Sequence, residues 1–234
     1  MEPHAYPAAW IEAIGWLSLA LAFASAAAIT IDIAVLGYRQ KMPIMNLVYP
    51  VTALYWGPVA AWFYFRHGRR QSQRLIKERG EPDPEELPRW NVLSKAVSHC
   101  GAGCTLGDIA GEWLVLTLGL AIAGKSLLAD MPMDFAWAWA LGIVFQYFSI
   151  VPMRSIGKVK GIWAAIKADT LSILAFQLGL FAGMAIYQEL IFPPGLPKTT
   201  ATYWMMMQLA MILGFFTAWP VNSWLIRMGI KEKM

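Results

Sequence analysis

The chain has 234 residues, of which 58% are hydrophobic and 15% are charged, with a formal net charge of +4. A soluble domain of this length could not cover so much apolar side chain, so the composition excludes an ordinary soluble enzyme and indicates a multi-pass protein of the lipid bilayer. The basic residues stand in short segments between apolar runs, where they set membrane topology. We therefore expect no nucleic-acid partner.

Six apolar runs follow one another along the chain and predict six membrane-spanning helices. The first two are residues 10–36 and 44–65, and the short link between them predicts a helical hairpin. The other four are residues 95–123, 135–153, 169–192 and 203–226. The predicted fold class is all-α: a six-span transmembrane helical bundle, composed of a two-span N-terminal hairpin and a four-span bundle.

A charged segment, residues 66–90, separates these two parts. It contains Arg-His-Gly-Arg-Arg and, later, Glu-Pro-Asp-Pro-Glu-Glu-Leu-Pro. Such a composition predicts a solvated linker, with room for one short amphipathic helix at residues 71–79. We therefore expect an N-terminal two-span hairpin at 1–65, a cytoplasmic charged linker at 66–90 and a four-span membrane domain at 91–234.

The distribution of lysine and arginine predicts the orientation. Six spans place both termini on one side, and if that side is the cytoplasm, 15 basic residues lie inside. Four remain outside, namely Arg39, Lys41, Lys125 and Lys198. The positive-inside rule then favours two cytoplasmic termini. The charges around the first span alone argue for the opposite insertion.

The stretch from Ser98 to Trp113 holds both cysteines, one of three histidines and two acids. If it is helical, one stripe with a four-residue period contains Cys100, Cys104, Asp108 and Glu112. The adjacent stripe contains His99, Gly103, Gly107 and Gly111. Glycines at this spacing let another helix backbone come close, so we expect both stripes to face the protein interior.

Thiolate and imidazole ligands select soft or borderline ions such as Cu(I) and Zn(II). One helix can present Cys100 and Cys104 to a single ion, but on an unbroken helix His99 points about 140° away from Cys104. A disulfide between the two cysteines is not expected, because their Cβ atoms would be too far apart. The competing interpretation is that both are small interior residues beside a glycine seam.

Methionine is the second signal. Met131 and Met133 fall in a predicted outer loop at residues 124–134, and three further methionines begin the last span. Thioethers bind Cu(I), although methionine at helical spacing is also common core filler. The full set of predicted metal ligands is His99, Cys100, Cys104, Asp108, Glu112, Met131, Met133, Met205, Met206 and Met207.

Glu112 lies in mid-span with no cation near it in the sequence. Such a carboxyl group is protonated, is paired, or lines a water-filled path for cations or protons. Lys167 and Asp169 are instead expected at the cytoplasmic interface, where their charged ends reach water.

Three functions remain open. The leading hypothesis is a membrane protein that handles copper, by transport or by delivery, with a copper-dependent membrane complex or a homo-oligomer as partner. The second is a membrane thiol oxidoreductase, in which Cys100 is a nucleophile activated at a helix N-terminus. The third is a non-catalytic structural subunit of a membrane complex, with the polar stripe serving helix packing alone.

Several motifs together resemble one bacterial membrane-protein family that is catalogued as a domain of unknown function. They are His-Cys-Gly-Ala-Gly-Cys-Thr-Leu-Gly-Asp at 99–108, Lys-Ala-Asp-Thr-Leu-Ser at 167–172, Tyr-Trp-Met-Met-Met-Gln at 203–208 and Trp-Pro-Val-Asn at 219–222. The resemblance covers residues 91–234 and implies a bacterial inner (cytoplasmic) membrane protein. Some members are labelled copper oxidases, but this sequence lacks the His-rich ligand sets of such enzymes.

Overall fold

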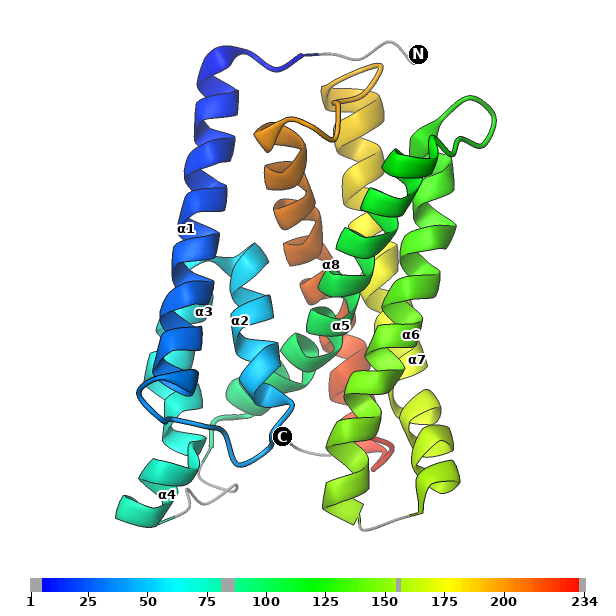
Figure 1. The fold of residues 1–234 in the computed structure, drawn as a ribbon. Coiled ribbons are helices and arrows are strands. Elements are labelled where there is room, and N and C mark those ends of the chain that lie inside the picture. The colour runs from blue at the N-terminus through cyan, green and yellow to red at the C-terminus, as the bar shows by residue number, and fades with distance from the viewer. Residues whose placement is uncertain (1–5, 81–86, 155–156, 232–234) are drawn as a thin grey trace.

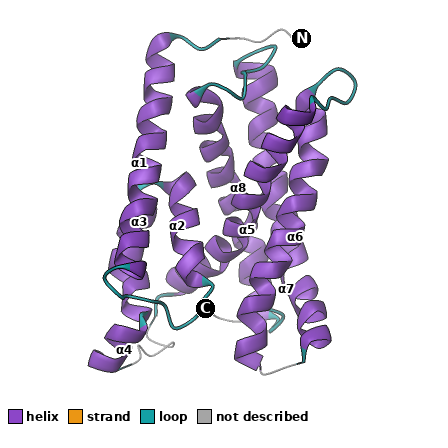
Figure 2. Ribbon diagram, viewed as in Figure 1, coloured by secondary structure: helices purple, strands orange, loops and turns teal. Residues whose placement is uncertain are grey.

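The computed structural model describes residues 6–80, 87–154 and 157–231, and the named elements there are all helices. Figures 1 and 2 show them as one upright bundle. Its long helices are α1 (Ala9–Ala34), α5 (Arg89–Leu118), α6 (Ser126–Arg154), α7 (Lys158–Ala185) and α8 (Ala201–Arg227). Four of these, α1, α6, α7 with its extension to Ile191, and α8, are long and apolar enough to cross a membrane. The prediction of an all-α, membrane-type bundle is confirmed.

α5 is 30 residues long and runs antiparallel to α6 along a glycine seam. Gly103 packs on Gly142, Gly107 on Ala138, and Gly111 on Asp134, so the contacts step by four residues on both helices. A Cβ atom at Gly103 or Gly107 would come within 3.0 Å of backbone atoms of α6. The predicted close approach is therefore present, and α5 crosses the bundle beside α6.

The second predicted span, residues 44–65, does not cross the bundle. It forms two short helices, α2 (Met45–Trp56) and α3 (Pro58–Phe63), that lie side by side in Figure 1. Gly57, between them, has a φ of +53°, which favours glycine, and Pro58 then starts the new helix. At 12 residues, α2 is about 18 Å long, whereas a hydrocarbon core is about 30 Å thick.

Backbone hydrogen bonds show that this segment returns to the end at which it starts. Gln73 N donates to Arg39 O at 2.8 Å, and Lys41 N donates to Gln71 O at 3.1 Å. The chain before α2 is thus joined to the chain after α3 and its short π- and 3-10 turns (Tyr64–Gly68 and Arg69–Gln71). We call residues 45–63 the re-entrant hairpin, and the predicted count of six spans is not confirmed.

α1 and α8 run in the same direction. Glu12 accepts hydrogen bonds from Ala201 N (2.7 Å) and Thr202 N (3.0 Å), so the two helices begin together. Farther along both helices, Ser18 Oγ donates to Gln208 Oε1 at 2.6 Å. The start of α1 and the end of α8 therefore lie at opposite ends of the bundle (Figure 1), and not at one end as six spans would require.

The fold places Arg39 and Lys41 at the opposite end of the bundle from the one that six spans predict. Arg39 and Lys41 lie beside residues 71–73, next to the short helix α4 (Gln73–Arg79), which matches the helix predicted in the linker. We call this end, where α5 and α7 also begin, the basic end. The opposite end, where α1 and α8 begin, is called the far end, and the loops there carry Lys125 and Lys198.

Candidate functional site: a polar line along α5

The motif stripe on α5 is buried in the bundle. Cys100, Cys104 and Asp108 have no exposed surface, and Glu112 is 2% exposed. We call these four residues the α5 line. The glycine seam next to them brings α6 close enough to exclude lipid, so the prediction that the stripe faces the interior is confirmed.

At the far end, one lysine joins two carboxylates. Lys198 stands in the loop between the π-helical turn Ile186–Ile191 and α8, and its Nζ lies 2.5 Å from Glu112 Oε2 and 2.5 Å from Asp130 Oδ1. Burial lowers the pKa of Lys198, but the carboxylates of Glu112 and Asp130 raise it, and the result lies above the ordinary lysine value. Lys198 is therefore a cation at neutral pH. The indole Nε1 of Trp204 donates a hydrogen bond to the backbone carbonyl oxygen of Lys198 at 2.9 Å.

Two more carboxyl groups lie next to this pair without a cation. Asp108 Oδ1 accepts a hydrogen bond from Gln177 Nε2 of α7 at 2.6 Å. Asp134, one helical turn after Asp130 on α6, sits over Gly111, and its Oδ1 has no hydrogen-bond partner in the described structure. Within the described ranges, neither Asp108 nor Asp134 has an ion-pair partner.

The two cysteines are the first two residues of the α5 line, and both are free thiols. Their side chains are completely buried and stand one helical turn apart on α5. Phe176 of α7 belongs to the same core cluster as both thiols. The thiols therefore lie on α5 between Asp108 and the basic end, in an apolar part of the core.

At the basic end, a second lysine reaches into the bundle. After α8 the chain turns back, and Lys231 Nζ donates to Asp169 Oδ1 at 2.6 Å, with both side chains completely buried. Ser172 Oγ lies 3.5 Å from the same ammonium group and donates to Asn222 Oδ1 at 3.0 Å. The prediction of Asp169 at the water interface is therefore wrong, because Lys231 covers it.

A family model described as a domain of unknown function, DUF4396, matches residues 89–231. This chain belongs to the DUF4396 family. The DUF4396 domain begins at the first residue of α5 and contains α6, α7, α8 and Lys231. It therefore contains the α5 line and both of the lysines described above. No curated protein and no solved structure matches the chain.

Within the DUF4396 domain, His99 does not join the cysteines. α5 is unbroken, so the imidazole lies on the α6 side, with its ring centroid 6.3 Å from that of Phe145. Both ring nitrogens lack a hydrogen-bond partner in the part of the chain that is described. Among the described residues, no three His, Cys, Asp or Glu side chains converge to hold one metal ion.

The predicted methionine ligands fall in two places of the DUF4396 domain. Met131 and Met133 are in α6 and not in a loop, because the tight turn at residues 122–125 lets α6 begin at Ser126. The other three, Met205, Met206 and Met207, are in the first turns of α8. Met207 is buried in the same core cluster as Cys100 and Cys104.

Cys100 also lies elsewhere than the oxidoreductase hypothesis requires. It stands in the interior of α5, eleven residues after the helix begins at Arg89, and its side chain is completely buried. A helix N-terminus therefore does not activate it, and a substrate cannot reach the thiol in this conformation.

Sequence reasoning missed the charged residues that other elements place beside the α5 line. Asp130 and Asp134 were assigned to a loop, although their four-residue spacing continues through Ala138 to Gly142 and predicts a second interior stripe. Lys198 and Lys231 have no comparable signal, because each stands outside the long helices.

Proposed function

We propose that this protein moves protons through the membrane along the α5 line. One observation carries the proposal: the described interior of the DUF4396 domain holds five buried carboxyl groups, whereas the lysines that reach into it are Lys95, Lys198 and Lys231. Lys95 has no hydrogen-bond partner among the described residues. Lys198 pairs with Glu112 and Asp130, and Lys231 pairs with Asp169. The buried carboxyl groups that remain are those of Asp108 and Asp134.

Two ionised carboxylates without a cation would each cost several kcal/mol in a low-dielectric interior, about the desolvation penalty of a buried ion. Each group therefore holds a proton or needs a passing cation. Protons fit the geometry better than a divalent metal, since a proton needs one donor and one acceptor at a time. A divalent ion needs several ligands at once, and no three converge in the described residues.

The two lysines would close the two ends of the path. Lys198 stands at the far end and Lys231 at the basic end, and each belongs to a segment outside the long helices. A small movement of either segment would expose the neighbouring carboxylates to water without unpacking a helix. We infer from the positive-inside rule that the basic end is cytoplasmic and that the far end, with the start of α1, lies outside.

Proton flux into liposomes tests this proposal. The purified protein would be reconstituted around a trapped pH-sensitive dye, with a potassium diffusion potential as driving force. We expect flux with the native chain, none with Asp108→Asn or Glu112→Gln, and native flux with the control Glu189→Gln, an exposed carboxylate outside the line. Absence of flux in the native chain, or native flux in Asp108→Asn, would contradict the proposal.

A second candidate is delivery of Cu(I), and one observation favours it. Cys100 and Cys104 are buried thiols one helical turn apart on the α5 line, with Met207 in the same core cluster. Two thiolates can hold Cu(I), which sulfur ligands select. Competition with a coloured Cu(I) chelator would detect one ion per chain, lost in both Cys100→Ser and Cys104→Ser. A copper-dependent membrane complex would then receive the ion.

A further inference from the structure

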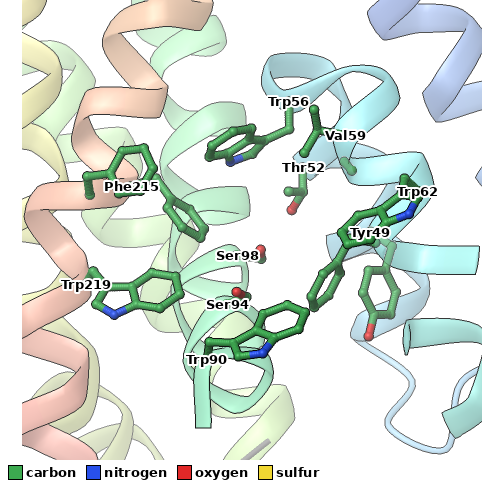
Figure 3. Close-up of a pocket in the computed structure, with 13 residues that line it drawn as sticks. Tyr49, Thr52, Trp56, Val59, Trp62, Trp90, Ser94, Ser98, Phe215 and Trp219 are labelled. Atoms are coloured by element: carbon green, nitrogen blue, oxygen red, sulfur yellow. The ribbon is translucent and has the colours of Figure 1, made fainter. Parts of the chain in front are cut away.

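Apart from the α5 line, the bundle contains an aromatic cavity. It lies between the re-entrant hairpin, the start of α5 and the second half of α8, and has a volume of about 220 Å³ (Figure 3). Eight of the 13 residues that line it are aromatic, and none of them carries a formal charge. We call it the aromatic cavity.

The rings form walls with fixed orientations. Trp56 of the hairpin packs edge-to-face on Phe215 of α8, with ring centroids 5.4 Å apart. Trp62, Trp90 and Phe216 form a rim that is 58%, 42% and 55% exposed. We infer that this rim faces lipid and that the cavity opens sideways into the bilayer, with Trp90 near the basic end, where α5 begins.

Three hydroxyl groups stand among these rings. Thr52 comes from α2, and Ser94 and Ser98 come from one face of α5, one turn apart and in line with Trp90. Figure 3 shows all three hydroxyl oxygens between the aromatic side chains. Thr52 is 5% exposed, and its Oγ1 has no hydrogen-bond partner within the described residues. A buried hydroxyl group without a hydrogen-bond partner costs free energy unless a ligand supplies that partner.

We propose that the aromatic cavity binds a flat, uncharged ring that carries carbonyl oxygens and an apolar tail, which is the chemical class of membrane quinones. Aromatic side chains bind a flat ring by stacked and edge-to-face contacts. The hydroxyls of Thr52, Ser94 and Ser98 donate hydrogen bonds to the ring oxygens, and the sideways opening leaves the tail in lipid.

A lipid acyl chain fits this description less well. Such a chain would fill the apolar walls but would leave the buried hydroxyl group of Thr52 without a partner among the described residues. A charged ligand is also disfavoured, because no side chain with the opposite charge lines the cavity. The proposal concerns binding alone and does not depend on proton movement along the α5 line.

Quenching of tryptophan fluorescence by decylubiquinone, titrated into the purified protein in detergent, tests the proposal. We expect saturable quenching. The double variant Thr52→Val with Ser98→Ala should raise the Kd about thirtyfold, since it removes two hydrogen bonds that contribute about 1 kcal/mol each. Ser149→Ala removes a buried hydroxyl outside the cavity and should leave the Kd unchanged. Melting temperatures would confirm that both variants are folded.

Competition with an alkane distinguishes a quinone from a lipid acyl chain as the occupant of the aromatic cavity. Dodecane, which has no ring and no oxygen, should not displace the quinone at equal concentration. Non-saturable quenching, a native Kd in the double variant, or full displacement by dodecane would each overturn the proposal, and the last would identify a site for lipid chains.

Discussion

Replacing Lys198 by methionine should destabilise the protein strongly, because two buried carboxylates then lose their shared cation. The side chains of Lys198, Glu112 and Asp130 are only 7%, 2% and 3% exposed, so water cannot replace the ammonium group. Breaking such a buried pair costs about 3 to 5 kcal/mol. For a chain of this size that corresponds to a loss of roughly 6 to 20 °C in melting temperature.

The loss should depend on pH in a defined direction. In the native chain the raised pKa of Lys198 means that the ion pair contributes fully below the ordinary lysine pKa of about 10.4. That contribution is lost only as the pH rises through the raised value. In Lys198→Met the carboxyl groups can instead take up protons, so the melting temperature of the variant should rise as the pH falls from about 8 to about 5.

Thermal unfolding in detergent, followed by circular dichroism, measures both effects. Lys125→Met is the matched control, because Lys125 makes an exposed ion pair with Glu189 that is worth less than about 1 kcal/mol. Adding Glu112→Gln and Asp130→Asn to Lys198→Met should restore part of the stability. If Lys198→Met melts like the control at every pH, the three groups do not form a coupled buried ion pair.

Three further experiments test the packing and the topology. Gly107→Ala places a Cβ against the backbone of α6 and should lower the free energy of unfolding by about 1 to 3 kcal/mol. Gly157→Ala is the control, because Gly157 has open space around it. Equal melting temperatures for the two variants would contradict the close packing of α5 on α6. Glu12→Gln weakens the acceptor for two backbone N–H groups at the start of α8 and should cost about 1 kcal/mol; an unchanged melting temperature would show that this cap adds nothing. In a chain without its native cysteines, an impermeant maleimide should label Lys125→Cys in intact cells and Lys77→Cys only after permeabilisation, and the reverse pattern would refute the proposed orientation.

The fold class and the interior stripe of α5 follow from the amino-acid sequence alone. Composition and the lengths of the apolar runs predict membrane helices, because the bilayer sets both. The four-residue spacing of Cys100, Cys104, Asp108 and Glu112 follows from helix geometry alone, and the glycine stripe next to them predicts a close neighbour. These are local properties of one helix, so no tertiary information is needed.

Where the chain turns back and which charges meet depend on how the helices pack. The run 44–65 is apolar enough for a span, and the sequence does not reveal that residues 39–41 hydrogen-bond to residues 71–73 and make it a re-entrant hairpin. Likewise, Lys198 and Lys231 are far in sequence from the carboxylates that they neutralise. Such pairings depend on how separate helices pack and on the cost of leaving a charge unpaired in the interior, which no local pattern in the sequence encodes.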